Sequence, residues 1–376
     1  MKALTTMEQK ILEMIKSNRF ISQNELAQQL GISRSAVAGH ISGLMRKGFV
    51  LGRAYVLAEE GRITCLGGAH IDRKARTLQK VQYGTSNPVQ VQESFGGVAR
   101  NIAENLGRLG ASVALITGVG RDKEGEAVLQ YCRQHGIDVS QSAIFSEGKT
   151  GTYTAILDPT GEMVLALADM AIYDLVTWEV IEKKWTHLAA SSWIVVDTNL
   201  PKEVLTHLVA RCHEEEIPLC IVPTSVPKLD RIPENLEGVE LFIGNRDEIA
   251  SLVGENAPSR EQVPELCQRV LDKGAKQVIL TMGAEGVFFI DAQGDKGWLT
   301  PAVQPIVDVT GAGDAFAAGV LFALNQGQEL SVACRTGMSL AELTLQTEES
   351  VHSSLTRSLL KERLGEWGSY LKETEA

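Results

Sequence analysis

The sequence has no apolar run long enough to cross a bilayer. Stretches such as WIVV at 193–196 are far shorter than the roughly 20 residues that a spanning helix needs. The first residues, MKALTTMEQKILEMI, also lack the basic, apolar and small segments of a secretory signal peptide. We therefore expect a cytoplasmic protein without membrane contact.

Paired cysteines are also missing. The six cysteines are scattered, and none belongs to a C-x-x-C pair. Neither a disulfide framework nor a zinc site is indicated, and buried reduced thiols are the simplest interpretation. The chain contains no internal repeat or low-complexity tract, and its 44% hydrophobic and 22% charged residues are ordinary for a globular protein.

Charge is distributed unevenly along the 376 residues. Residues 1–57 contain eight lysines and arginines and three glutamates, a net charge of +5, whereas the whole chain carries −11. The remainder is therefore strongly acidic, at −16. Any contact with nucleic acid is expected to involve the basic N-terminal segment alone.

The pattern of this basic segment predicts three short helices and a hairpin. Apolar residues recur at helical spacing in MEQKILEMIKSN, SQNELAQQLG and SRSAVAGHISGLMRKG, and FVLGRAYVL alternates around Gly52 as a short hairpin does. Ser22 and Glu25 match a capping box, and Gly31 ends the second helix. This order resembles the winged helix-turn-helix family over about residues 1–58.

The resemblance implies that the third helix lies in the major groove of duplex DNA. The residues that would face DNA are Ser33, Arg34, Ser35 and His40, and those that would meet phosphates are Arg46, Lys47 and Arg53. A helical module for dimerisation or docking is the alternative, because the excess of positive charge is modest.

From about residue 62 the pattern changes to apolar runs that alternate with helical segments. Runs such as ITCLGGAHID, SVALITGVG, IPLCIVPTS and QVILTMG alternate with segments such as VARNIAENLGRLG and PKEVLTHLVARCHEEE. Continuous apolar strands separated by helices predict a parallel sheet covered on both faces, with the ligand beyond the carboxyl ends of the strands. Residues 76–95 and 150–168 break this rhythm, and the second alternates as a β-hairpin with a turn at 158–161. We expect them to form a small sheet that acts as a lid.

The stretch DVTGAGDAF at 308–316 carries the strongest chemical signal. Gly311, Ala312 and Gly313 form a turn before an apolar, helix-prone segment, so free N–H groups and the positive end of a helix dipole would face a phosphate. Asp314 follows, and the dipole is expected to keep its carboxylate ionised. The carboxylate could accept a hydroxyl proton as the oxygen attacks phosphorus. Taken alone, a G-x-G-D stretch is more often an ordinary strand-to-helix turn.

Two motifs together resemble the PfkB/ribokinase family of carbohydrate and nucleoside kinases. DVTGAGDAF resembles its C-terminal signature, and FGGVARNIAENLGRLG at 95–110 resembles its N-terminal signature. Both occur in the expected order within about residues 62–372. The resemblance implies a ribokinase-like three-layer α/β sandwich with a small β lid. It also implies a kinase that binds ATP and Mg²⁺, with Asp314 as the base and the amides of 311–314 around the transferred phosphoryl group.

The same resemblance assigns roles to further residues. Those expected to bind the sugar are Asp72, Gly96, Gly97 and Asn101. Those expected near ATP are Thr281, Gly283, Gly286 and Thr310. Asn245 and Glu248 match an N-x-x-E motif that holds Mg²⁺ through water, although the same spacing is also that of a helix capping box. Asp308 lies where some members bind a monovalent cation such as K⁺.

Three stretches indicate the substrate class. GGVARNIAENLGRLG, LDPTGEMVLALADM and VVDTN are most similar to the branch of the family that phosphorylates the 5′-hydroxyl of pseudouridine. That similarity adds Thr152 and Asp169 of the lid and Asn199 of a strand end to the nucleoside site. Two departures are VPTS at 222–225, where DPVS is usual, and Ala168, where asparagine is common.

Several alternatives stay open at this point. The acceptor could be a purine nucleoside such as inosine or guanosine, or a free sugar such as ribose or a fructose derivative. In a different class, the fold could be the ligand sensor of a transcription regulator with vestigial catalysis. We also expect a homodimer.

Overall fold

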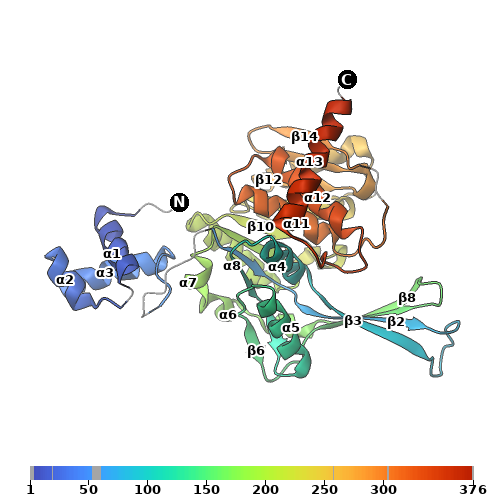
Figure 1. Cartoon of the computed structure of the whole chain (residues 1–376), viewed down its shortest axis with the longest axis horizontal. Helices are drawn as coiled ribbons and strands as arrows, with labels where there is room; N and C mark the ends of the chain where they lie inside the picture. The colour runs from blue at the N-terminus through green and yellow to red at the C-terminus, as the bar shows by residue number, and fades with distance from the viewer. Residues whose placement is uncertain (1–3, 19, 53–60, 257, 303–304, 375–376) are drawn as a thin grey trace.

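The computed structural model describes the chain except residues 1–3, 19, 53–60, 257, 303–304 and 375–376. Figure 1 shows an N-terminal group of helices, a large α/β body, and a small sheet that projects from the body on the side away from these helices. None of the helices in the described part of the chain combines the length and hydropathy that a bilayer span requires.

Three helices form the N-terminal unit: α1 (Thr6–Ser17), α2 (Gln23–Leu30) and α3 (Arg34–Arg46). Both α1 and α2 begin with a capping box, and that of α2 is the predicted pair Ser22 and Glu25. The three helices enclose a core of their own, which includes Ile11, Ile15, Leu26, Val37 and Leu44. About half of the predicted hairpin, from residue 53 on, lies outside the described residues.

An eight-stranded sheet forms the centre of the body, in the order β14-β13-β12-β11-β10-β9-β1-β4. Its strands are β1 (Ile63–Leu66), β4 (Val113–Ile116), β9 (Trp193–Asp197), β10 (Leu219–Val222), β11 (Leu241–Asn245), β12 (Gln277–Thr281), β13 (Val287–Asp291) and β14 (Lys296–Leu299). The strands from β4 to β12 are parallel, and β13 and β14 extend the sheet in antiparallel pairing. The parallel strands are buried almost throughout, as their continuous apolar sequences predict.

Helices cover both faces of this sheet. One face packs against α4 (Val98–Arg108), α5 (Lys123–Gln134), α11 (Ala312–Leu324) and α12 (Leu330–Thr344), and the other against α6 (Trp178–Glu182), α7 (Trp185–Leu188), α8 (Lys202–Glu214), α9 (Arg246–Leu252) and α10 (Val263–Asp272). Along β12, Ile279 faces the first core, and Val278 and Leu280 face the second. The structure thus confirms the three-layer sandwich. A two-stranded sheet of β5 (Gly118–Gly120) and β6 (Ala143–Phe145) lies apart from the main sheet, and α13 (Arg357–Thr374) packs on α12.

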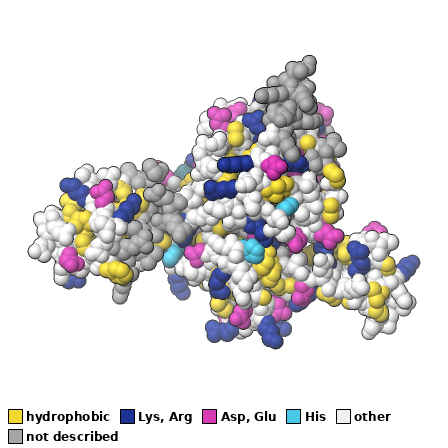
Figure 2. All heavy atoms as spheres, in the orientation of Figure 1, with side chains coloured by type: hydrophobic (Ala, Val, Ile, Leu, Met, Phe, Trp, Pro, Cys, Tyr) yellow, Lys and Arg dark blue, Asp and Glu magenta, His cyan; other side chains and the backbone are white. Residues whose placement is uncertain are grey.

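The projecting sheet lies where the sequence predicts a lid. Its strands, in the order β3-β2-β7-β8, are β2 (His70–Thr77), β3 (Val89–Gly96), β7 (Thr152–Leu157) and β8 (Met163–Asp169). The sheet begins before the predicted residue 76, because ITCLGGAHID is two strands: β1 ends at Leu66, and β2 starts at His70. Hydrophobic side chains are exposed on the projecting sheet (Figure 2), including Val89, Val91, Leu165 and Leu167.

Candidate active site

The glycine turn at 311–313 leads into α11. Gly311 adopts a left-handed conformation with a φ of 80°, and a Cβ there would lie 2.1 Å from the Ser350 carbonyl oxygen, so only glycine fits. The N–H of Ala312 donates at 3.3 Å to the carbonyl three residues earlier. The N–H groups of Gly311, Gly313 and Asp314 have no hydrogen-bond partner within the described part of the chain. Of the predicted amides at 311–314, these three are therefore open to an anion.

Asp314 lies in the first turn of α11 and meets Asn101 of α4. Asn101 Nδ2 donates to Asp314 Oδ2 at 2.6 Å, which joins residues 213 positions apart. Burial raises the pKa of Asp314 to about 7, and the hydrogen bond from Asn101 and the positive charge of Arg100 offset this only in part. From the sequence, the helix dipole is expected to keep this group ionised; the structure differs because the carboxyl is buried, which opposes ionisation. A carboxylate with a pKa near 7 is a stronger base than an exposed one.

The turn between β3 and α4 passes close to the start of the lid. Gly97 has a φ of 104°, and a Cβ there would lie 2.2 Å from a carbonyl oxygen of the glycine loop after β1. A Cβ on Gly96 would lie 2.2 Å from the Asp72 carboxylate. His70 Nε2 lies 3.2 Å from Asp72 Oδ1. The structure thus brings together Asp72, Gly96 and Gly97 at the N-terminus of the helix that carries Asn101.

The lid strands place the predicted residues Thr152 and Asp169 opposite each other. In the neighbouring pair of strands, however, Asp72 lies beside Tyr153. Successive side chains of a strand point to opposite faces, so Tyr153 and its partner Ala168 share the face of Asp72, and Thr152 and Asp169 lie on the other face. The structure does not bring Thr152 and Asp169 to Asp72. Sequence reasoning missed Tyr153, which the alternation in TYTAIL would indicate once the pairing with Asp72 is known.

Asn199 follows β9, and its side chain is already hydrogen-bonded. Its Nδ2 donates to Asp197 Oδ2 at 3.1 Å, and its Oδ1 accepts from Lys228. Asp197 Oδ2 also accepts from the N–H groups of Gly68 at 2.8 Å and Ala99 at 3.1 Å. Burial raises the pKa of Asp197 despite these bonds. Asp197 thus connects β9 to the glycine loop and to α4 through hydrogen bonds. Sequence reasoning missed this residue, although an acid at the end of the apolar run WIVVD is a visible signal.

Asn245 and Glu248 form a capping box at the start of α9. Asn245 Oδ1 accepts from the Glu248 N–H, and Glu248 Oε2 accepts from the Asn245 N–H, both at 2.9 Å. Burial raises the pKa of Glu248. Among the described residues, Glu248 Oε1 has no hydrogen-bond partner, and no three His, Cys, Asp or Glu side chains gather as a direct metal centre. One free carboxylate oxygen beside an amide fits Mg²⁺ held through water.

Three of the four predicted nucleotide residues, Thr281, Gly283 and Gly286, lie at the end of the neighbouring strand β12. Thr281 ends this strand and lies beside Asn245 in the parallel register. Gly283 begins a short 3₁₀ turn, and Gly286 ends it just before β13. The proposed metal and nucleotide residues therefore share the carboxyl ends of two adjacent strands, where ligands of such sheets bind.

Asp308 is bonded from two sides. Its Oδ1 accepts from the Thr310 N–H at 2.9 Å and from the Thr310 hydroxyl at 2.7 Å, and its Oδ2 accepts from Lys74 Nζ of the lid at 2.9 Å. Burial opposes ionisation, but these bonds hold the pKa of Asp308 below its usual value. K⁺ would have to compete with the Lys74 ammonium for this carboxylate. Sequence reasoning did not single out Lys74.

The predicted DNA-facing residues lie mainly at the start of α3. Ser33 is the N-cap, its hydroxyl accepting from the N–H three residues on, and Ser33, Arg34 and Ser35 are all exposed. His40 lies further along α3 and is half-buried. Arg53 lies outside the described residues.

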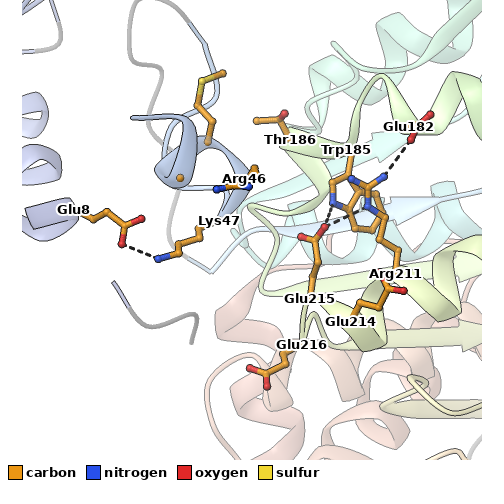
Figure 3. Close-up of a pocket in the computed structure, with 12 residues that line it drawn as sticks. Glu8, Arg46, Lys47, Glu182, Trp185, Thr186, Arg211, Glu214, Glu215 and Glu216 are labelled. Atoms are coloured by element: carbon orange, nitrogen blue, oxygen red, sulfur yellow. Dashed lines mark hydrogen bonds and ion pairs between the residues drawn. The ribbon is translucent and has the colours of Figure 1, made fainter. Parts of the chain in front are cut away.

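Arg46 and Lys47, at the other end of α3, line a groove between the N-terminal unit and the body (Figure 3). The groove has a volume of about 790 Å³. On the side formed by the N-terminal unit, Lys47 Nζ pairs with Glu8 at 2.7 Å. The acidic residues of the body that line it are Glu182, Glu214, Glu215 and Glu216. Gly48 packs so closely on the body that a Cβ there would lie 2.4 Å from the Ala189 carbonyl oxygen. DNA phosphates would therefore reach Arg46 and Lys47 only beside an acidic surface.

Two family models match the chain. The model of the pfkB family of carbohydrate kinases matches residues 61–357. A model of winged helix-turn-helix DNA-binding units matches residues 4–50.

The chain matches individual relatives over nearly the full length of each relative. The chain is 29% identical over 300 residues to the pseudouridine kinase of Escherichia coli (strain K12), covering 80% of this chain and 95% of that protein. It is 29% identical over 337 residues to the uncharacterized sugar kinase YeiI of the same organism, covering 90% and 92%. A solved structure of a carbohydrate kinase from Agrobacterium tumefaciens matches with a TM-score of 0.71 and 32% identity, covering 81% of this chain and 97% of that one.

Proposed function

Because the chain belongs to the pfkB family of carbohydrate kinases, we propose that it transfers the γ-phosphoryl group of ATP to the 5′-hydroxyl of a nucleoside, with pseudouridine as the first candidate. One observation carries the proposal: Asn101 Nδ2 donates to Asp314 Oδ2 at 2.6 Å. This contact links the turn that would hold the sugar to the acid at the turn that would hold the phosphoryl group.

Asp314 takes the proton of the attacking hydroxyl in this mechanism. Burial raises its pKa to about 7, so a large fraction is ionised near neutral pH and the ionised form is still basic. The open N–H groups of Gly313 and Asp314 would donate to the transferred phosphoryl group. Asp72 would orient the acceptor by accepting hydrogen bonds from two of its hydroxyls.

Asn245 and Glu248 would hold Mg²⁺ through water. When bound, the ion supplies positive charge to the nucleotide phosphates. The contribution of the chain is the capping box, which fixes both side chains at the start of α9.

Support for pseudouridine comes from the motifs GGVARN, LADM and VVDTN and from the 29% identity to a pseudouridine kinase. The departures at VPTS 222–225 and Ala168 reduce that support, and so does the position of Thr152 and Asp169 on the lid face opposite to Asp72. Inosine, guanosine, ribose and fructose derivatives therefore stay as alternative acceptors. A sensor with vestigial catalysis is disfavoured, because it would not need a base and open amides at one turn.

The test is ATP consumption by the full chain with pseudouridine, uridine, inosine, guanosine, ribose and fructose as acceptors. We expect the highest kcat/KM for pseudouridine. Activity on ribose alone would exclude a nucleoside substrate. No consumption with any acceptor would favour the sensor.

We also propose that residues 1–58 bind duplex DNA through the start of α3. The winged helix-turn-helix match and the exposure of Ser33, Arg34 and Ser35 support this. DNA would approach this end of α3, because the other end lies beside the acidic groove.

Finally, we propose a homodimer formed through the lid. Val91, Ala75, Ile156 and Leu165 form one row across the four strands, on the face opposite to Asp72. Val91 and Leu165 are exposed by 56% and 49%. A second copy of the sheet would cover this apolar row.

A further inference from the structure

Arg100 is a buried charge next to the proposed base. Only 2% of it is exposed, and it immediately precedes Asn101 in α4. Its guanidinium donates to the side chains of Glu104 and Asn101 and to the backbone carbonyls of Phe95 and Gly96. A buried charge is costly unless its partners compensate it fully, so this set of bonds is needed for the fold. Two of the bonds, to Gly96 and Asn101, reach residues of the proposed sugar site.

The bond from Arg100 decides which end of the Asn101 amide faces Asp314. A guanidinium can only donate hydrogen bonds, so it binds the Oδ1 end of the amide. The Nδ2 end is then directed at Asp314, to which it donates at 2.6 Å. In the reverse orientation, Oδ1 would face a carboxylate, and two acceptors repel each other.

Glu104 anchors Arg100 from the next turn of α4. Its side chain is 1% exposed and pairs with Arg100 through one oxygen. Its other oxygen accepts from Arg108 Nε at 2.8 Å and from the Tyr131 hydroxyl at 2.9 Å. Burial acts to raise the pKa of Glu104, but Arg100, Arg108 and Tyr131 together hold it below its usual value. Glu104 is therefore ionised at neutral pH and keeps its arginine partner in place.

The charged groups around Asp314 act in opposite directions. Burial is the largest influence and raises its pKa, and the negative charges of Asp197 and Glu248 raise it further. Arg100 lowers it, together with the hydrogen bond from Asn101. Arg100 thus favours the ionised base both through its charge and through the amide that it orients.

We propose that Arg100, held by Glu104, is a positioning residue that turns the Asn101 amide toward Asp314 and keeps that carboxylate available as a base. The inference rests on the proposed function, because it concerns the same proton transfer. A purely structural role is the competing explanation, since the bonds of Arg100 to Phe95 and Gly96 would fix the turn before α4 without acting on Asp314.

The test compares Arg100→Met with Arg108→Met in the full chain. Both remove a cation from Glu104, and Arg108 makes its side-chain bonds to Glu104 and to the Ser353 carbonyl, not to Asn101. For Arg100→Met we expect kcat to fall about tenfold with the KM for ATP unchanged, and the acid midpoint of kcat/KM to rise by about one pH unit. Arg108→Met should keep the wild-type midpoint. Arg100→Lys should restore the midpoint through its charge but not kcat, because one ammonium does not replace the fork of donors.

A second measurement, of thermal stability, does not depend on kinase activity. Thermal unfolding of each protein is compared with that of its Asp314→Asn derivative across pH. The derivative gains stability over its parent as the pH rises, and this gain reaches a plateau once the pH passes the folded pKa of Asp314 in the parent. We expect the plateau near pH 7 in the wild type and about one unit higher in Arg100→Met. An unshifted plateau, or the same kinetic change in Arg108→Met, would overturn the inference. A shifted plateau in a protein that phosphorylates no acceptor would support the positioning role and reject the proposed function.

Discussion

The variant Asp314→Asn should be nearly inactive and yet more stable than the wild type. Asparagine is close in size to aspartate but cannot take up the hydroxyl proton. General-base catalysis contributes about 10²- to 10⁴-fold, so kcat should fall at least about a hundredfold. The Asn101 contact can persist, because the new amide offers an oxygen at the position of Asp314 Oδ2.

The gain in stability follows from the cost of ionising Asp314 where it lies. Burial raises its pKa from 3.8 to about 7, and each unit corresponds to about 1.36 kcal/mol, so the ionised group costs at most about 4 kcal/mol above pH 7. Below about pH 3.8 the carboxyl is protonated in both the folded and unfolded chains, and the cost is absent. The cost grows as the pH rises from 3.8 to about 7. For a domain of this size it corresponds to a rise in Tm of about 5 °C.

Thermal unfolding between about pH 4 and pH 8, together with ATP consumption, measures both effects. Asp308→Asn, six residues before Asp314, is the matched control. Despite partial burial, bonds from Thr310 and Lys74 hold the pKa of Asp308 below its usual value, so this variant should lose stability at neutral pH. That difference should disappear as the pH falls through the folded pKa of Asp308. Near-normal turnover by Asp314→Asn, or no increase in its Tm at about pH 8, would refute the reasoning.

Three further predictions concern the lid and the N-terminal unit. Lys74→Met removes the ammonium that lies 2.9 Å from Asp308 Oδ2, so kcat should depend more strongly on K⁺ than in the wild type; an unchanged ratio of rates in KCl and in a bulky organic cation would contradict this. Arg34→Ala should weaken binding to a duplex taken from the DNA upstream of the protein's own gene, and should reduce the salt slope of that binding by about one, with kinase activity retained. Unchanged gel shifts would exclude this residue from the DNA contact. Leu165→Glu places a charge in the apolar row of the lid and should give monomers by light scattering, and a dimer that persists would have to use another surface.

The fold was largely predictable because its central strands are buried on both faces. Such strands must be apolar throughout, and the helices between them are long enough to carry their own periodicity. The same property hides boundaries within an apolar run. ITCLGGAHID reads as a single strand, although β1 ends at Leu66 and β2 begins at His70 as part of another sheet.

The residues of the site were predictable one at a time, but their contacts were not. Asn101 and Asp314 each belong to a recognisable motif, yet 213 positions separate them, and no local rule predicts their hydrogen bond. The lid shows the same limit: TYTAIL alternates visibly, but only the pairing of Asp72 with Tyr153 tells which face meets the site. The motif therefore identified Thr152 as a candidate but could not tell on which face of the projecting sheet its side chain lies.

Charge states show why local rules fail at this site in particular. Asp122 and Asp314 both lie at the start of a long helix, where the dipole favours an anion. The pKa of Asp122 is lowered, because bonds from Thr150 and Gly125 outweigh its modest burial, whereas the pKa of Asp314 is raised. The helix dipole and the N-cap hydrogen bonds act on an acid within one helical turn, so a few neighbouring residues of the sequence are enough to predict their effect on its pKa. Desolvation depends on everything packed around a group, and the side chains that act on Asp314 come from three distant parts of the chain, at 100–101, 197 and 248. Of the two acids, Asp314 depends more on tertiary structure, so the sequence could not predict its pKa. The proposed mechanism depends on that pKa, because Asp314 is the proposed base.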